Sequence, residues 1–161
     1  MRRISIFGAT GSVGANGVDL IRRDPQSYQV VALTGGRNIA RLAQMARDLR
    51  AQIAVTAHPE LLDDLRTALA GTDVQAAAGE AALIEAAHRP ADWILSAIVG
   101  AAGLAPGLAA LSQGGVLALA NKESLVCAGA LLRDTGARSG ATILPVDSEH
   151  SALFQAIGAD K

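Results

Sequence analysis

The sequence has little of several residue types, and each shortage excludes a class of protein. A single cysteine, Cys127, stands among the 161 residues, so no internal disulfide can form, which fits a reducing compartment such as the cytoplasm. The formal net charge is -1 and no basic stripe is present, which argues against a nucleic-acid partner. No apolar run approaches the roughly 18 residues that a membrane span needs. The amino terminus enters a predicted strand almost at once, so we expect no signal or transit peptide and no membrane partner.

Aromatic residues make up only 2% of the chain although hydrophobic residues make up 50%, so we expect a core of Ala, Val, Leu and Ile. Strand and helix patterns alternate without low-complexity linkers, which predicts an α/β fold with a doubly wound parallel sheet. Such sheets bind ligands at the carboxyl ends of their strands. The predicted strands are 3–7, 29–34, 51–55, 74–77, 92–98, 116–119 and 142–144, and the predicted helices are 13–23, 39–49, 59–69, 80–87, 104–111 and 124–139.

A glycine loop, Gly8-Ala9-Thr10-Gly11-Ser12-Val13-Gly14, joins the first predicted strand to the first helix. Gly8 permits a tight turn, Gly11 lets a pyrophosphate approach the backbone, and Gly14 allows the helix to pack closely on the strand. The helix N-terminus offers free N–H groups to phosphates, and Thr10 and Ser12 add hydroxyl donors. The loop therefore predicts a dinucleotide-binding site, with a glycine turn that binds no ligand as the alternative.

The end of the second predicted strand indicates which nucleotide binds. NAD-selective sites place an acid there, whereas this chain reads Gly35-Gly36-Arg37-Asn38. Arg37 suits the 2′-phosphate of NADP, because its planar guanidinium donates two parallel hydrogen bonds. Arg37 could instead be a solvated surface charge, and Asn38 could either assist the cofactor or cap the next helix. We predict a preference for NADP over NAD.

Three polar residues, Asn121, Lys122 and Glu123, stand between a buried strand and an apolar helix. Polar groups at such a place are costly unless they are used. Lys122 could meet a substrate phosphate or polarise a carbonyl, and Asn121 and Glu123 could face the cofactor. Alternatively, Asn121 caps the helix and Glu123 balances its dipole. Further along the helix, Cys127 lies in an apolar stretch, so we expect a buried thiol and not a nucleophile.

Two carboxylates follow the last predicted strand, in the stretch Leu144-Pro145-Val146-Asp147-Ser148-Glu149-His150-Ser151. Asp147 and Glu149 lie two residues apart, which in an extended chain puts both on one face. Oxygen ligands of this kind suit Mg²⁺ or Mn²⁺, although two carboxylates cannot complete an octahedral shell. The alternative is that Asp147 and Ser148 cap a helix from about Glu149 to Ile157.

The glycine loop, the Leu119–Val126 stretch with its Asn-Lys-Glu triplet, and the segment 144–151 together resemble three motifs of the 1-deoxy-D-xylulose 5-phosphate reductoisomerase family, in the same order and at about the same spacing. The family rearranges the carbon skeleton of its substrate and then reduces the resulting aldehyde with NADPH, giving 2-C-methyl-D-erythritol 4-phosphate in non-mevalonate isoprenoid biosynthesis. The resemblance implies a Rossmann-like NADP domain, a Mg²⁺ or Mn²⁺ ion, a sugar-phosphate substrate and a homodimer for the whole enzyme.

The resemblance also implies a role for individual residues, which we take as expectations. Lys122 and Glu149 would be catalytic, Lys122, Ser148 and Glu149 would contact the substrate, and Asp147 and Glu149 would bind the metal. His150 would lie near the site, whereas His58 and His88 are expected at the surface. Relatives often carry Lys where Arg37 stands, which keeps the charge. The residues expected to bind the cofactor are Thr10, Gly11, Ser12, Val13, Gly36, Arg37, Asn38, Asn121 and Glu123.

The family's members are much longer than this chain. By the resemblance, residues 1–140 form the NADP-binding domain and residues 141–161 begin a metal- and substrate-binding catalytic domain. A chain of this length alone is therefore expected to bind cofactor without turnover. Two other functions stay open at this point. One is a different NADP enzyme such as an aspartate-semialdehyde dehydrogenase, which needs a nucleophilic cysteine, and the other is a non-catalytic dinucleotide-binding module.

Overall fold

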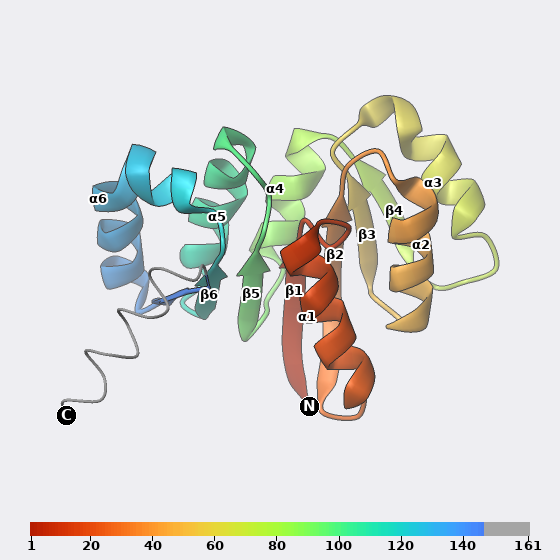
Figure 1. Ribbon diagram of the computed structural model, residues 1–161, viewed down its shortest axis with the longest axis horizontal. Helices are drawn as coiled ribbons and strands as arrows, with labels where there is room; N and C mark the ends of the chain where they lie inside the picture. Colours follow the sequence, from red (N-terminus) through yellow and green to blue (C-terminus); the bar gives the residue numbers. More distant parts are fainter. Residues whose placement is uncertain (147–161) are drawn as a thin grey trace.

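A seven-stranded parallel sheet is the centre of the computed structural model, which describes residues 1–146 (Figure 1). The strands lie in the order β4-β3-β2-β1-β5-β6-β7, and every neighbouring pair is parallel. This confirms the predicted α/β doubly wound fold. The strands are β1 (Arg2–Phe7), β2 (Tyr28–Gly35), β3 (Ile53–Thr56), β4 (Gln75–Ala78), β5 (Trp93–Ser96), β6 (Val116–Leu119) and β7 (Thr142–Pro145).

Helices cover both faces of the sheet and form two separate hydrophobic cores. On one face, Val18, Leu42 and Leu65 bring α1, α2 and α3 against the strands, and on the other Leu83, Leu111 and Leu132 do the same for α4, α5 and α6. The helices are α1 (Ser12–Arg23), α2 (Ile39–Asp48), α3 (Leu62–Ala68), α4 (Glu80–His88), α5 (Leu104–Leu111) and α6 (Lys122–Ser139), with 3-10 turns η1 (Pro59–Leu61) and η2 (Ala101–Gly103).

The predicted elements are all present, and their differences from the prediction are local. The helix expected over 59–69 is divided, because Pro59 opens a 3-10 turn that leads into α3. The helix expected from Ser124 begins at Lys122. The Asn121 side chain accepts a hydrogen bond from the Ser124 N–H and so caps the first helical turn, which contains Lys122 and Glu123. The pairing of β7 with β6 carries the sheet past the domain boundary predicted after residue 140. The division into two domains stays a prediction.

The sheet reverses its winding between β1 and β5. The chain first builds β2, β3 and β4 on one side of β1, and then β5, β6 and β7 on the other. The loops that leave β1 and β5 therefore diverge, which opens a crevice at the carboxyl ends of these two strands. Gly8 turns at this point with φ of 81°, and a Cβ there would lie 2.5 Å from the carbonyl oxygen of Ala97, so only glycine fits.

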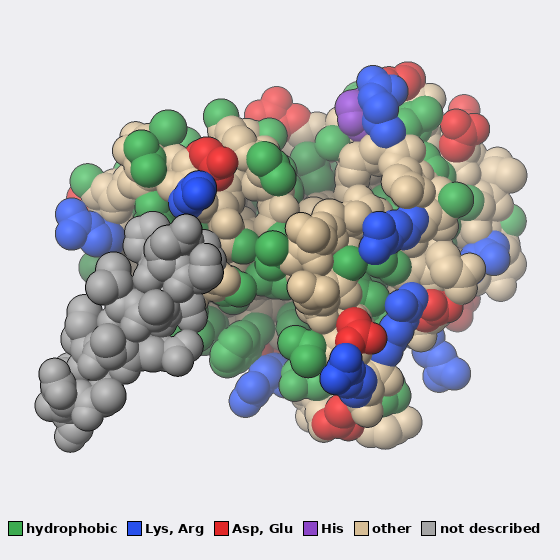
Figure 2. Space-filling view, in the orientation of Figure 1, with side chains coloured by type: hydrophobic (Ala, Val, Ile, Leu, Met, Phe, Trp, Pro, Cys, Tyr) green, Lys and Arg blue, Asp and Glu red, His purple; other side chains and the backbone are tan. Residues whose placement is uncertain are grey.

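Within residues 1–146, part of one sheet face carries an apolar groove. A groove of about 490 Å³ runs beside α1 and is lined by apolar side chains of α1, β5 and β6, among them Leu20, Trp93 and Leu95. Figure 2 shows hydrophobic side chains gathered on this face of the molecule. Among residues 1–146, no helix has the length and apolar character that crossing a membrane requires.

Candidate functional site

The predicted site residues within the described part of the chain gather at the carboxyl edge of the sheet, because all strands are parallel. Two neighbouring pockets along this edge, together called the groove from here on, share Gly11 and the loop from Ala97 to Val99 in their linings. The part over β1, β2 and β3 measures about 230 Å³, and the part toward α6 about 160 Å³. A hollow of about 400 Å³ at the opposite edge, near Pro25 and Asp48, contains none of the predicted site residues.

The glycine loop lies in the middle of this groove. A Cβ at Gly14 would overlap the carbonyl oxygen of Gly8, which confirms that Gly14 permits close packing of α1 on the loop. Gly11 precedes α1 and places no side chain over its first turn, where Ser12, Val13 and Gly14 have N–H groups without helical acceptors. Thr10 lies against Gly35 at the end of β2. The loop thus offers a row of backbone donors to an anion.

At one end of the groove, the loop after β2 carries Gly36, Arg37 and Asn38. The Asn38 side chain accepts a hydrogen bond from the Arg41 N–H over 3.1 Å, so it caps α2, as one of the two predicted alternatives has it. Arg37 is exposed, and its guanidinium lies 3.1 Å from a carboxylate oxygen of Glu60. The 69% exposure of the Arg37 side chain fits both the solvated alternative and the 2′-phosphate contact, so the role of Arg37 stays a prediction.

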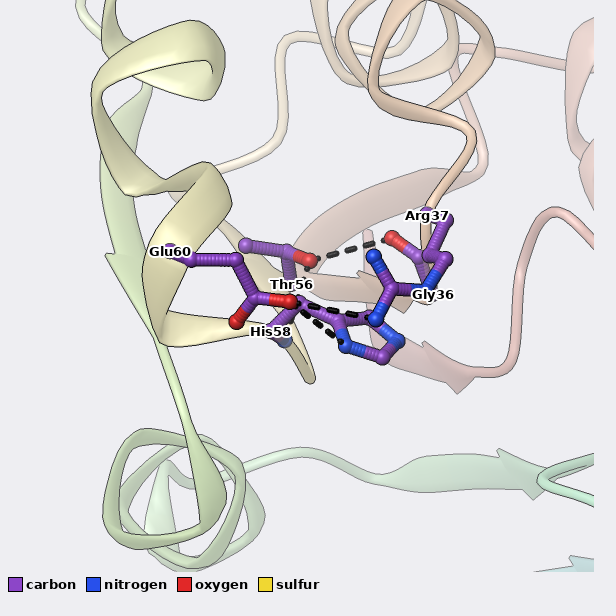
Figure 3. A network of polar contacts seen from close by, with 5 residues as sticks. All are labelled: Gly36, Arg37, Thr56, His58 and Glu60. Carbon is purple, nitrogen blue, oxygen red and sulfur yellow. Dashed lines mark hydrogen bonds and ion pairs between the residues drawn. The ribbon is translucent and has the colours of Figure 1, made fainter.

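Figure 3 shows that Glu60 and His58, which follow β3, lie beside Arg37 of the loop after β2. The Nδ1 atom of His58 lies 3.5 Å from the same Glu60 oxygen. The pKa of the Glu60 carboxyl is below its ordinary value, first because the Glu60 N–H donates to it and then because of the Arg37 and His58 charges. His88 is exposed, as expected, whereas the His58 side chain is only 32% exposed and belongs to this cluster.

Sequence reasoning missed Glu60 as a member of the site. Arg37 and Glu60 stand at the ends of two strands that the sequence predicts as separate elements, without their order in the sheet. The structure makes β2 and β3 neighbours, with Gly35 opposite Thr56, and this brings the loops that follow them together. The available signal was that both residues follow the carboxyl end of a predicted strand.

At the other end of the groove, Lys122 and Glu123 form the first turn of α6 and line the same pocket as Gly11, Ser12 and Val13. The structure therefore brings two of the three predicted motifs together. Lys122 is exposed and Glu123 is half-buried.

Asn121 is only 3% exposed and uses its whole side chain within the protein. Its amide nitrogen donates to the carbonyl oxygens of Ile98 over 2.6 Å and Gly100 over 2.8 Å, and its oxygen accepts from the Ser124 N–H. A Cβ at Gly103 would overlap this amide nitrogen, so a side chain there would displace Asn121. Asn121 thus caps α6 and holds the loop after β5 against this helix by hydrogen bonds. The cap is one of the two alternatives that the sequence left open.

The prediction that Cys127 is a core thiol is wrong, because the residue is exposed. The buried positions of α6 are Ser124, Leu132 and Gly136, which repeat at intervals of four or eight and leave Cys127 off the stripe. The helix is also interrupted at Ala128, with φ of -144° and ψ of 30°. Cys127 lies on a helix and does not line the groove, so its position does not resemble a nucleophile in a polar turn.

The predicted metal and substrate ligands Asp147, Ser148 and Glu149, together with His150, lie outside the described residues. Within residues 1–146, no three His, Cys, Asp or Glu side chains lie close enough together to hold a metal ion. The preceding strand, β7, ends at the carboxyl edge of the sheet, where the Val146 N–H donates to the Leu119 carbonyl oxygen over 3.0 Å.

Comparisons with known proteins agree with this arrangement. The family profile of 1-deoxy-D-xylulose 5-phosphate reductoisomerase matches residues 4–129. The chain is 71% identical to the enzyme of that name from Ruegeria pomeroyi over 157 residues, which cover 98% of this chain and 40% of the relative. This chain therefore spans about 40% of the length of that curated relative.

Solved structures of the same enzyme superimpose closely. The reductoisomerase from Zymomonas mobilis in complex with NADPH matches 96% of this chain and 41% of its own, with a TM-score of 0.94 and 53% identity. A DOX-P reductoisomerase in complex with NADPH, fosmidomycin and magnesium matches 99% of this chain and 41% of its own, with a TM-score of 0.92 and 41% identity. These matches support the resemblance and not the alternative dehydrogenase.

Proposed function

This chain belongs to the 1-deoxy-D-xylulose 5-phosphate reductoisomerase family, and we propose that it forms the NADPH-binding part of an enzyme that converts 1-deoxy-D-xylulose 5-phosphate to 2-C-methyl-D-erythritol 4-phosphate. The observation that carries the proposal is the pair of neighbouring pockets at the carboxyl edge of the sheet that share Gly11 of the glycine loop. Lys122 lines one pocket, and Gly36, the residue before Arg37, lines the other. The whole enzyme would work in the cytoplasm as a homodimer.

The cofactor would lie along this groove. Its 2′-phosphate would meet Arg37 with Gly36 and Asn38, and its pyrophosphate would meet Thr10, Gly11, Ser12 and Val13 at the start of α1. The pyrophosphate contacts would come largely from backbone donors whose position the fold fixes, because Gly8 packs against Ala97 after β5 and Gly14 of α1 packs against Gly8. NADPH, when bound, supplies the hydride for the reduction.

The other end of the groove would receive the nicotinamide and the substrate. Glu123 would face the cofactor and Lys122 the substrate, since both line the pocket beside Ser12 and Val13. Asn121 would reach the cofactor through its backbone, because its side-chain donors and acceptor are already engaged. Its side chain would act by holding the first turn of α6 and the loop after β5 in position.

Asp147 and Glu149 would bind Mg²⁺ or Mn²⁺, and Ser148 and Glu149 would contact the substrate. Carboxylate oxygens are the ligands these ions prefer, and the strand before them, β7, ends at the same edge as Lys122. The ion, when bound, would polarise the substrate carbonyl and stabilise the negative charge that develops on its oxygen. Lys122 would add a positive charge beside the substrate from the protein itself.

A titration of the chain with NADPH and with NADH, followed by nucleotide fluorescence, tests the proposal. The Arg37→Ala variant should lose about tenfold or more in affinity for NADPH, since hydrogen bonds to a charged group contribute about 1.5–3 kcal/mol. Its affinity for NADH should not change. A matched control is Arg23→Ala, which also removes an exposed, paired arginine but lies at the end of α1, far from the groove.

Equal affinity of the unchanged chain for both nucleotides would contradict the assigned 2′-phosphate contact. Failure to bind either nucleotide would contradict the cofactor site as a whole. A loss of NADPH affinity in Arg23→Ala as large as in Arg37→Ala would mean that net charge, and not the contact, sets the preference.

A further inference from the structure

The Arg37 guanidinium has a carboxylate partner at the place proposed for the 2′-phosphate. Glu60 lies 3.1 Å from a terminal nitrogen of Arg37, and the same oxygen lies 3.5 Å from His58 (Figure 3). NAD-selective sites place an acid beside the ribose, and here no acid follows β2. The structure supplies one from the loop after β3 instead.

Hydrogen bonds join the two loops that carry Arg37 and Glu60. The hydroxyl of Thr56, a fully buried residue, donates to the Gly36 carbonyl oxygen over 3.0 Å and accepts from the His58 N–H over 3.3 Å. Pro59 then starts the 3-10 turn that presents Glu60. The backbones that carry the two side chains are thus held next to each other, which keeps the Glu60 carboxylate within reach of Arg37.

A phosphate and the Glu60 carboxylate compete for the same cation. A phosphate monoester carries a charge of about -1.5 to -2 at neutral pH, so its approach to a carboxylate is unfavourable. The Arg37 and Glu60 side chains are 69% and 56% exposed, so no wall separates the carboxylate from an arriving phosphate. The lowered pKa of Glu60 keeps the group ionised at neutral pH, so protonation does not relieve the competition.

We propose that Glu60 is a specificity-determining residue. It pairs with Arg37 in the cofactor-free protein, and an adenosine 2′-phosphate has to displace it from the guanidinium. This competition lowers the affinity for NADPH relative to the affinity for NADH. The inference rests on the proposed cofactor site, because it needs the 2′-phosphate to arrive at Arg37. It goes beyond that site by giving Glu60, which contributes no donor to the phosphate, a measurable role in nucleotide choice.

Calorimetric titration with two adenosine fragments isolates this end of the groove. Adenosine 2′,5′-bisphosphate carries the 2′-phosphate, and adenosine 5′-monophosphate lacks it. In Glu60→Gln, affinity for the bisphosphate should rise about two- to fivefold at low salt, the range of an exposed ion pair, and affinity for the monophosphate should not change. The gain should shrink as salt is added, because both side chains are exposed.

The matched control is Asp63→Asn, which removes an exposed carboxylate three residues along the chain whose partner is Arg66 and not Arg37. It should leave both affinities unchanged. The gain from Glu60→Gln should also become much smaller when Arg37 is already replaced by Ala, since the competition acts through the guanidinium.

Unchanged or weaker binding of the bisphosphate in Glu60→Gln overturns the inference, and weaker binding would show that Glu60 positions Arg37 for the phosphate. If the unchanged chain binds the bisphosphate in preference to the monophosphate while Glu60→Gln has no effect, only this inference fails. If the unchanged chain does not prefer the bisphosphate, the proposed 2′-phosphate site fails together with it.

Discussion

The strands on either side of β1 carry similar side chains but have different surroundings. Leu33 of β2 and Leu95 of β5 both lie in register with Ile6 and pack against the same core. Leu33 is fully buried beneath the helices of that face, whereas Leu95 is only partly buried and lines the open groove. Because both residues are leucines, their position in the sheet sets how much solvent-accessible surface each one buries on folding.

The physical cause of this difference is the hand of the crossovers. Parallel strands are joined by right-handed crossovers, so a chain that winds outward in one direction places its helices on one face, and after reversing it places them on the other. α1, α2 and α3 therefore cover β1 to β4, and α4, α5 and α6 cover the opposite face. Among the described helices, α1 reaches only β5 of the strands β5, β6 and β7 on the first face, and the apolar groove lies beside it, where β6 contributes Ala118.

The largest expected effect concerns the contact between α1 and the glycine loop, beside the point where the winding reverses. Gly14→Ala should lower the free energy of unfolding by about 3 kcal/mol or more, because the added Cβ overlaps the backbone of Gly8 and either α1 or the loop must move. In contrast, Gly107→Ala in α5 meets no atom within 4 Å and should stabilise by up to about 1 kcal/mol. Urea unfolding followed by circular dichroism measures both.

Equal stability of Gly14→Ala and the unchanged protein would contradict the tight packing of α1 on the glycine loop. A large loss in Gly107→Ala would show that α5 is packed more closely than the structure indicates.

The second effect tests the comparison of β2 with β5 directly. Leu33→Ala should cost about 3 kcal/mol of unfolding free energy, because it leaves a cavity in a closed core. Leu95→Ala should cost about 1 kcal/mol, because the leucine is already partly in solvent and the open groove can adjust. Both values come from the same urea titration. Equal losses of unfolding free energy would mean that the apolar groove beside α1 is closed in solution.

The smallest effect concerns the ion pair that joins β1 to the start of β5 at the amino edge of the sheet. Arg3, in β1, donates to Asp92, next to β5, through its guanidinium over 2.9 Å and its N–H over 2.8 Å. These bonds hold the pKa of Asp92 below its ordinary value, the guanidinium bond first. Its stabilisation is therefore present above the ordinary pKa near 4 and is lost as the pH falls through the lower folded value.

Asp92→Asn should accordingly be less stable than the unchanged protein at pH 7 and should lose less stability on acidification below about pH 4. Thermal unfolding at a series of pH values measures this. Asp19→Asn, which removes the carboxylate of an exposed pair within α1, is the control for the loss of one exposed carboxylate. Parallel pH profiles for Asp92→Asn and the unchanged protein would contradict the assignment.

Much of the fold could be predicted because its signals are local. The alternating strand and helix patterns predicted every strand and α-helix of residues 1–146, although not the two 3-10 turns, and the glycine spacing correctly assigned Gly8 to a turn and Gly14 to a packing contact. The failure at Cys127 has the same origin. An apolar neighbourhood in the sequence predicted burial, but the kink at Ala128 and the direction of the α6 stripe turn the thiol outward.

The sequence by itself determined the order of the elements, the parallel sheet, and the residue types that stand at its carboxyl edge, because side-chain periodicity and glycine sterics act over a few residues. Only the tertiary structure decided which of these residues meet. Arg37 faces Glu60 because β2 and β3 are neighbours. The Leu95 side chain is only partly buried because the winding reverses at β1. Both facts depend on strand order and crossover hand, which no local pattern encodes.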